Sequence, residues 1–328
     1  MAIKRGVSLY SYQQTYYKGE FDLEGCVKAA SMAGAEGIEL IPEQMMIGTY
    51  PNPTDAEVAQ WFDLMETYHT RPTCLDAFMD TRMYKNRFLT LKEQVQLMER
   101  DLKLASKLGF SSIRVLCHVR PEVIEASLPI AQHYNIKMGL EVHAPFKLDG
   151  EWINNLVEMI ERKNTPYAGL IPDFGIFGRG PDGAQYRLAK LKGADESILK
   201  EISDTCKNNG DVLALERDLI KREVGPLELK LAKAATFVRY NNPELLRRFE
   251  KHLIHFHAKF YEMNEDYKET SIDYENPIRI LKDMGWDGYL SSEFEGQRPY
   301  QVQDCSYEAD EVEQVRRHHI MMKRLIEG

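Results

Sequence analysis

Short apolar runs alternate along the chain with longer segments in which apolar residues recur at helical spacing. Alternation of side-chain character over four to eight residues is typical of a strand, whereas a repeat of three to four residues is typical of an amphipathic helix. Eight runs have the strand pattern, at residues 6–12, 37–41, 71–78, 112–117, 136–142, 167–172, 253–260 and 288–294. In the first run, we expect Tyr10 and Tyr12 to share one face of the strand.

Helical segments separate the strand-like runs. They are predicted at residues 22–34, 54–68, 90–108, 121–134, 151–162, 277–284 and 309–326. The first is bounded by Asp22 as an N-cap and Gly34 as a C-cap, and a Thr-x-x-Glu capping box from Thr54 to Glu57 opens the second. Residues 181–251 are too long for one return helix and hold four helical patterns of their own, at 195–206, 211–221, 227–238 and 243–251.

Eight strand and helix alternations in 328 residues predict a (β/α)8 TIM barrel of the α/β class. We expect a single domain over residues 1–328, with a helical insertion at about 181–251 between strands six and seven. A doubly wound open sheet is the alternative. It fits less well because no Gly-x-Gly-x-x-Gly motif follows the first strand.

Size and charge limit the classes of function. A hydrophobic content of 43% allows a large buried core, and 42 Lys and Arg against 51 Asp and Glu give a formal net charge of -9. The field of an acidic protein opposes a polyanion, so we expect no nucleic-acid partner.

The cysteines and the apolar runs bear on the cellular compartment. The five cysteines are scattered and include no Cys-x-x-Cys pair: Cys26, Cys74, Cys117, Cys206 and Cys305. They suggest reduced thiols rather than a disulfide framework. The N-terminus has no signal-type apolar stretch and no run reaches membrane-spanning length, so we expect a cytoplasmic protein with no membrane association.

Four consecutive strand-like runs end in side chains that bind metals: Glu141, Asp173, His257 and Glu293. The C-terminal ends of barrel strands meet on one face, so these side chains should converge. Carboxylate oxygens favour Mg2+ or Mn2+, and an imidazole admits later metals. We expect a divalent cation, Mn2+ in first place, with Mg2+ or Zn2+ as alternatives. Taken singly, each residue could equally be a hydrogen-bonded strand end.

Histidines next to this set have distinct predicted roles. His255 and His257 share a face of the seventh strand, and His257 lies nearer its end, where the other ligands lie. His255 should lie one layer deeper, as a hydrogen-bonded core residue or a support of the metal site. His143 follows Glu141 on the same face, and its imidazole titrates near neutral pH, so we expect it to act as a general base.

Further polar residues follow the strands and are candidates for binding substrate. They are Tyr10, His118, Lys259, Glu295 and Arg298. The charged ones could equally be solvated loop residues. Aromatic side chains at strand ends could line the mouth or serve only packing: Tyr10, Tyr12, Phe146, Phe174, Phe177 and Tyr261.

Four motifs resemble the metal-site strands of the xylose-isomerase-like TIM barrels, which include sugar epimerases, isomerases and inosose dehydratases. The motifs are Leu140-Glu141-Val142-His143, Ile171-Pro172-Asp173, His255-Phe256-His257-Ala258-Lys259 and Ser292-Glu293-Phe294-Glu295. The resemblance implies one divalent cation held by Glu141, Asp173, His257 and Glu293.

Within this group, the chain looks most similar to the larger, α subunit of bacterial C-glycoside deglycosidases. The opening Gly6 to Gln13, the His-Phe-His-Ala-Lys-Phe-Tyr run and the large insertion carry this likeness. It implies a small β subunit, a 3-oxo-C-glycoside substrate and catalysis by His143. Asp173 is followed by Phe174 rather than the His usual in epimerases, which disfavours a simple ketose epimerase.

The chemistry implied is carbon-carbon lysis. A ketone at sugar C3 acidifies the C2 proton, a metal stabilises the enolate, and loss of the C1 substituent releases a phenolic aglycone such as a flavonoid. The same enolate allows epimerisation, isomerisation or dehydration. A non-catalytic sugar-binding or assembly subunit is an alternative from another class. The sequence leaves open the aglycone or sugar, the physiological metal and the subunit stoichiometry, and the insertion is a candidate surface for a partner.

Overall fold

A computed structural model describes residues 3–46, 48–238, 240–303 and 306–328. Eight strands form one parallel sheet in the order β6-β5-β4-β3-β2-β1-β8-β7. The first four are β1 (Lys4–Ser8), β2 (Gly37–Leu40), β3 (Arg71–Ala77) and β4 (Ser112–Val115). The others are β5 (Lys137–Val142), β6 (Ala168–Pro172), β7 (Phe256–Phe260) and β8 (Tyr289–Phe294).

The seam between β6 and β7 closes this sheet into a barrel. Single parallel bridges join Leu170 to Leu253 and Asp173 to His257 across the seam. Gly169 allows the close approach, because an added Cβ atom there would lie 2.4 Å from the carbonyl oxygen of His252. The (β/α)8 prediction is therefore confirmed.

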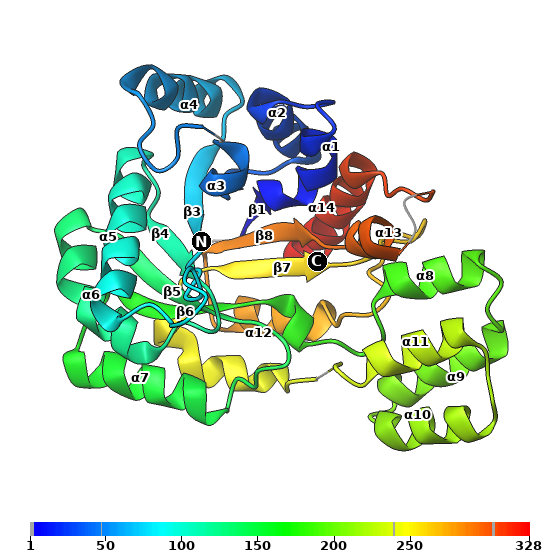
Figure 1. Cartoon of the computed structure of the whole chain (residues 1–328). Coiled ribbons are helices and arrows are strands. Elements are labelled where there is room, and N and C mark those ends of the chain that lie inside the picture. The colour runs from blue at the N-terminus through cyan, green and yellow to red at the C-terminus, as the bar shows by residue number, and fades with distance from the viewer. Residues whose placement is uncertain (1–2, 47, 239, 304–305) are drawn as a thin grey trace.

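Helices surround the barrel in an outer ring (Figure 1). The ring comprises α2 (Leu23–Ala33), α4 (Asp55–Thr67), α5 (Leu91–Lys107), α6 (Pro121–Tyr134), α7 (Glu151–Lys163), α12 (Glu275–Asp283) and α14 (Glu311–Glu327). Asp22 caps α2 and a capping box begins α4, as the sequence predicts. A second capping box, which was not predicted, begins α5. Three short helices lie in the segments between a strand and its ring helix, namely α1 (Gln13–Tyr17), α3 (Pro42–Met45) and α13 (Arg298–Gln303).

Between β6 and β7 the chain leaves the barrel and builds a helical lobe. It passes through η2 (Phe174–Ile176), α8 (Gly183–Leu191), α9 (Glu196–Lys207), α10 (Val212–Lys221) and α11 (Pro226–Ala235), and returns through the 3-10 segment η3 (Pro243–His252). The lobe has its own apolar core, which includes Leu199, Ile202, Leu219 and Leu231. It lies beyond the C-terminal ends of β7 and β8 (Figure 1), the end at which barrel enzymes carry their active sites.

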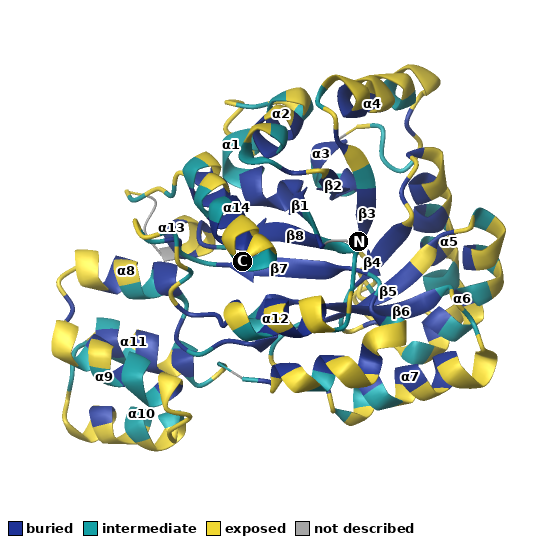
Figure 2. Ribbon diagram, turned by 180° about the vertical axis from the view of Figure 1, so that it is seen from behind, coloured by how far each residue is buried: buried dark blue, intermediate teal, exposed yellow. Residues whose placement is uncertain are grey.

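Burial follows this architecture. The strands are buried almost throughout, whereas the ring helices are buried on one face and exposed on the other (Figure 2). The four cysteines among the described residues are free. Cys26, Cys74 and Cys206 are buried and Cys117 is partly buried, while Cys305 lies outside the described residues. In the ranges that the structure describes, no helix has the length and apolar character needed to cross a membrane.

The start of the chain differs from its prediction. Strand β1 ends at Ser8, and Leu9–Tyr12 forms a 3-10 turn, η1. The Ser11 hydroxyl explains the turn: it donates to the carbonyl of Ser292 over 3.0 Å and accepts from the amide of Phe294 over 2.9 Å, which ties the turn to β8. The prediction that Tyr10 and Tyr12 share a strand face was therefore wrong.

Half of the six aromatic side chains proposed for the mouth belong to the core, whereas Tyr261 lines the pocket described below. Tyr12, Phe174 and Phe177 are fully buried, and the rings of Phe174 and Phe177 meet edge to face with centroids 5.6 Å apart. All three rings belong to the main apolar core rather than to the separate core of the lobe. Their positions at predicted strand ends did not reveal which way they turn.

Candidate metal centre and substrate pocket

Four ligand-type side chains meet at the C-terminal end of the barrel. Glu141 comes from β5, Asp173 directly follows β6, His257 lies in β7 and Glu293 in β8. One ligand atom from each lies within 4.8 Å of those from the other three, and all four residues are buried. The structure thus brings together the complete set that the sequence singles out.

The donor chemistry of this set fits a divalent cation. The Nδ1 atom of His257 lies 3.0 Å from Oε1 of Glu141 and 3.5 Å from Oε2 of Glu293. Within the described chain, Oδ2 of Asp173 and Oε2 of Glu293 are buried and accept no hydrogen bond of normal geometry. Buried carboxylates are stable only beside positive charge. Three carboxylates and one imidazole at this spacing can bind one metal ion, and the ion would provide the positive charge that the buried carboxylates require.

Two basic side chains also compensate the charge. Lys259 lies inside β7 and is 1% exposed, with Nζ 2.5 Å from Oδ2 of Asp173 and 3.3 Å from Oε2 of Glu293. Burial acts to lower the pKa of Lys259, but the charges of Asp173 and Glu293 outweigh it and raise the pKa well above its ordinary value. The interpretation of Lys259 as a solvated loop charge was therefore wrong, because the strand runs past it.

Arg114, from β4, lowers the pKa of the candidate ligand Glu141. Burial acts to raise the pKa of Glu141, and the charges of Arg114 and His257 reverse this and lower it to about 2. Glu141 is therefore ionised at neutral pH and available as a ligand.

His143 lies beside the metal-ligand set at the end of β5. Its Nε2 atom is 4.0 Å from Oδ2 of Asp173, and its side chain is 36% exposed. The other ring nitrogen, Nδ1, lies 2.5 Å from the carbonyl oxygen of Ala144. A carbonyl only accepts, so the neutral ring must carry its proton on Nδ1 and present the lone pair of Nε2 to the site. This is the arrangement that a general base requires.

A pocket of about 460 Å³ opens next to His143. Part of its wall comes from the ends of β5 and β8, through His143 and Glu295, and from Arg298 at the start of α13. The helical lobe supplies another part, including Asp182 and Phe237. The lobe is therefore a component of the pocket, which its sequence position alone did not indicate.

The predicted substrate-binding residues divide into two groups. Glu295 and Arg298 line the pocket. Tyr10, His118 and Lys259 are not among the described residues that line it. Lys259 is instead buried beside Asp173 and Glu293. The hydroxyl of Tyr10 accepts from Nε of Arg298 over 2.5 Å, so Tyr10 holds a lining residue in place. Nε2 of His118 lies 3.0 Å from the carbonyl oxygen of Met79 and thus ties two strand-end loops together.

A layer of buried charge below the ligand set was missed at the sequence level. Glu39 lies in β2, Asp76 in β3 and Arg114 in β4, and Nε of Arg114 donates to Oδ1 of Asp76 over 2.9 Å. Nε2 of His255 lies 2.7 Å from Oε2 of Glu39, in agreement with its predicted deeper position. The signal for this layer was a charged residue inside a run otherwise suited to full burial.

Comparison with known proteins identifies the family. A family model described as "Xylose isomerase-like TIM barrel" matches residues 27–323. The chain belongs to this family. The candidate ligands come from the strands that carry the resemblance: Glu141 from β5, Asp173 directly after β6, His257 from β7 and Glu293 from β8.

Curated relatives of this family member share one kind of name. The "C-glycoside deglycosidase alpha subunit" of Arthrobacter globiformis is 27% identical over 308 residues, which cover 89% of this chain and 84% of the relative. The "3'-dehydrocarminate deglycosidase alpha subunit" of a Microbacterium species is 28% identical over 311 residues, covering 89% and 88%. Both names describe deglycosidases and designate an alpha subunit.

Solved structures share the fold. The D-allulose 3-epimerase from a Methylomonas species in complex with D-allulose aligns with a TM-score of 0.57 at 11% identity, covering 98% of this chain and 97% of that one. A structure of IOLI protein "with a binding zinc atom" aligns with a TM-score of 0.57 at 12% identity, covering 99% and 98%. At such identities, the likeness shows the barrel fold alone.

Proposed function

We propose that this chain is the catalytic α subunit of a metal-dependent C-glycoside deglycosidase, a carbon-carbon lyase that acts on 3-oxo-C-glycosides. The observation that carries the proposal is the free Nε2 of His143 beside four convergent ligands in an open pocket. The names of the curated relatives support the choice of reaction.

Glu141, Asp173, His257 and Glu293 would hold the cation. A bound divalent cation supplies a Lewis acid, which stabilises negative charge developing on a ketone oxygen. The carboxylate-rich set favours Mn2+, and Mg2+ or Zn2+ would also suit it.

His143 would carry out the proton transfer. Nε2 accepts the proton from C2 of the 3-oxo sugar, and the electron pair of the C2–H bond forms the enolate with the C3 ketone. The enolate then reverts to the ketone as the C1–C2 double bond forms and the C1–aglycone bond breaks. The aglycone carbon leaves with the bonding electron pair and takes up a proton, so the products are an unsaturated 3-oxo sugar and a free phenol.

Lys259 and the pocket residues would complete the site. The ammonium of Lys259 adds a fixed positive charge beside Asp173 and Glu293. Glu295 lies 3.5 Å from Lys259 and Arg298 also lines the pocket, so both can bind sugar hydroxyls. Tyr10 would orient Arg298 through the hydrogen bond that joins them.

The proposal includes a partner and a location. The relatives are named alpha subunits, and we propose that this chain likewise works with a small β subunit. Free thiols at the four described cysteines support action in the reducing cytoplasm.

One experiment separates this function from its alternatives. The purified chain is incubated with a 3-oxo-C-glucoside of a flavonoid and Mn2+, with and without a candidate small subunit, and the products are resolved by chromatography. Release of free aglycone supports the lyase. A new sugar isomer with the C–C bond intact would establish an isomerase or epimerase instead, and binding without any product would indicate a non-catalytic subunit.

A further inference from the structure

Two exposed apolar side chains flank the pocket. Phe237 follows α11 in the lobe and is 63% exposed, and Val302 lies in the last turn of α13 and is 85% exposed. Both line the pocket, as do Ala234 and Pro299. Large apolar side chains gathered at the rim of a pocket are typical of a ligand-binding surface.

The rest of the pocket has a different character. His143, Glu295 and Arg298 come from the strand ends and from the first residue of α13. His143 lies 4.0 Å from Asp173 of the candidate ligand set, and Glu295 lies 3.5 Å from the Lys259 ammonium beside that set. The pocket therefore has charged groups near the strand ends, whereas Ala234 and Phe237 of the lobe and Pro299 and Val302 of α13 form an apolar patch on its wall; Asp182 and Gln185 add polar groups from the lobe. A substrate that joins a sugar to an aromatic ring has these same two parts.

We propose that Phe237, together with Val302, forms the subsite for the aromatic aglycone and sets the preference of the enzyme for phenolic rings. This inference rests on the proposed function, since it assigns the sugar to the polar part. Stacking and apolar contact with a ring explain why these side chains can stay exposed at the pocket rim.

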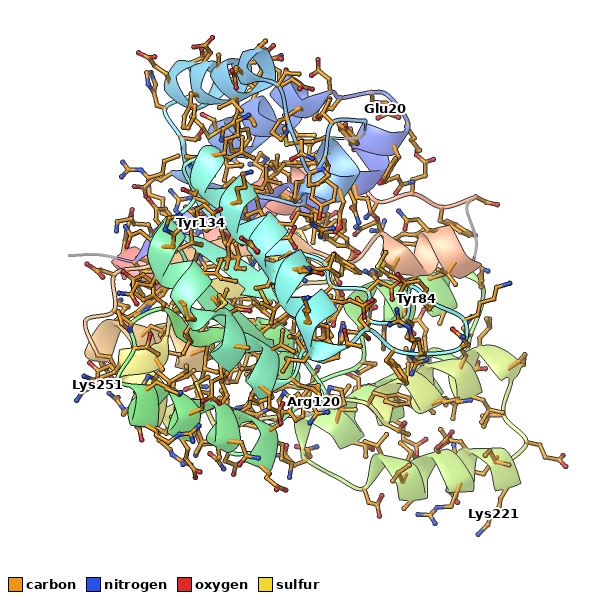
Figure 3. All side chains as sticks on the ribbon, turned by 60° about the vertical axis from the view of Figure 1, so that its left-hand side comes forward. Glu20, Tyr84, Arg120, Tyr134, Lys221 and Lys251 are labelled. Carbon is orange, nitrogen blue, oxygen red and sulfur yellow. The ribbon has the colours of Figure 1, made fainter. Side chains whose placement is uncertain are left out.

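The test uses binding of a free flavone, apigenin, to the metal-loaded protein by isothermal calorimetry. Phe237→Ala should weaken apigenin binding about tenfold, the equivalent of roughly 1.4 kcal/mol. The matched control is Leu213→Ala, because Leu213 is 55% exposed in the same lobe but lies on α10. Helix α10 ends at Lys221, which lies at the outer edge of the lobe (Figure 3). The control should bind apigenin as the wild type does.

The outcomes separate the subsite from the reaction. If Phe237→Ala and the wild type bind apigenin equally, the subsite is wrong, even when aglycone release is observed. If apigenin binding depends on Phe237 but no C-glycoside is cleaved, the subsite stands and the proposed reaction fails. An unchanged Mn2+ affinity in Phe237→Ala would show that the loss is confined to the apolar part.

A separate observation concerns the candidate metal ligand His257, whose two ring nitrogens have different neighbours. Its Nδ1 faces Glu141 and Glu293, whereas its Nε2 lies 3.1 Å from Oε1 of Glu39. The second carboxylate oxygen of Glu39 lies 2.7 Å from Nε2 of His255. Glu39 is fully buried, so one carboxylate spans both histidines with no access to water.

The geometry points to Glu39 as a positioning residue for the metal centre. Among the described residues, Oε1 of Glu39 and Nε2 of His257 make no hydrogen bond of normal geometry, so the carboxylate acts on the ring through its charge at 3.1 Å. A buried negative charge at this distance favours a proton on Nε2, which would leave the lone pair of Nδ1 for a cation. The pair between Arg114 and Asp76 lies on the same side of the ring, with Oδ1 of Asp76 3.8 Å from Nε2 of His257.

Metal affinity provides the test. Glu39→Gln should weaken Mn2+ binding by about 10- to 100-fold, the range found when a carboxylate that orients a ligand is removed. Asp101→Asn is the matched control, because Asp101 is likewise buried, with 1% of its surface exposed, but pairs with Arg100 on α5. Equal Mn2+ affinity in Glu39→Gln and the wild type, with both folded by circular dichroism, would overturn the proposal.

A measurement on the wild type keeps the proposal falsifiable if Glu39→Gln does not fold. Nitrogen NMR of 15N-histidine-labelled, Zn2+-loaded protein reports which ring nitrogen of His257 is protonated. We expect a proton on Nε2 and a metal-shifted Nδ1. A metal-shifted Nε2 would contradict the role of Glu39.

Discussion

The ammonium of Lys259 lies 2.5 Å from Oδ2 of Asp173, inside the barrel and among carboxylates that the sequence assigns to a metal. Lys259 and the proposed cation would therefore share the compensation of this buried negative charge. The stability of the protein and its metal affinity should consequently depend on each other.

Lys259→Met tests this dependence. Removing one partner of a buried ion pair leaves an uncompensated charge, which costs about 3–5 kcal/mol. We expect the metal-free variant to lose free energy of unfolding by about this amount, and Mn2+ to recover a large part of it. Chemical denaturation with EDTA and with Mn2+ measures both. Lys18→Met is the control, since Lys18 pairs with Glu308 at the surface, and its free energy of unfolding should stay close to the wild-type value in either condition. A loss in Lys259→Met that Mn2+ does not reduce would contradict shared compensation.

Cation binding should stabilise the wild type. A ligand that binds only the folded state adds about 2.7 kcal/mol at a concentration one hundred times its Kd. Mn2+ should therefore raise the Tm of the chelated protein, and Glu293→Gln should abolish most of this rise because Glu293 belongs to the ligand set. Differential scanning calorimetry with and without Mn2+ measures the shift. An equal rise in Glu293→Gln and the wild type would place the cation elsewhere.

His319 should make the fold sensitive to mild acid. Burial, with the charge of Arg5, lowers the pKa of His319 to about 3. Between this value and the unfolded pKa of about 6.5, His319 is protonated in the unfolded chain but not in the folded chain. The free energy of unfolding therefore falls as pH falls. From pH 7 to pH 5, His319 should account for a loss of at most about 2 kcal/mol.

The comparison with His319→Gln isolates this residue from the carboxylates that titrate in the same range. Urea unfolding at pH 7 and pH 5 should show a smaller acid-induced loss in the variant. Identical losses in the two proteins would exclude His319 as a source of acid sensitivity.

Gly296 should fix the turn that carries two pocket residues. A Cβ atom there would lie 1.9 Å from the carbonyl oxygen of Tyr261, so Gly296→Ala must push the turn after β8 away from β7. We expect a lower Tm and a higher KM, because Glu295 and Arg298 flank the turn. Gly180→Ala lies on another side of the pocket, and its nearest neighbour would be 3.7 Å away, so it should keep the Tm. Equal Tm values for the two variants would show that the turn accommodates the added Cβ atom without loss of stability, which would contradict this prediction.

Much of the fold and the centre was predictable because both follow from local rules. Periodicity located the eight strands, and closure of a barrel brings strand ends together. Glu141, Asp173, His257 and Glu293 could therefore be grouped into one site from their positions alone. The relative depths of His255 and His257 followed from alternation along one strand.

Features that depend on distant contacts were not predictable. Tyr10 and Tyr12 continue an alternating pattern, but hydrogen bonds from Ser11 to β8 turn the chain there. The length of the insertion did not indicate where it packs against the barrel. Only the structure shows that Phe237 lines the pocket. Glu39 was overlooked because its partners, His255 and His257, lie more than two hundred residues away in the sequence.

The most direct measurement is the turnover of a 3-oxo-C-glucoside by His143→Ala, made alongside a titration of its Mn2+ affinity. Loss of a general base should lower kcat by about 10²- to 10⁴-fold, while the Mn2+ affinity stays within about twofold of the wild type because the four ligands are intact. His133→Ala, an exposed histidine on α6, should match the wild type in both. Wild-type turnover by His143→Ala would contradict proton abstraction by His143 and with it the proposed mechanism.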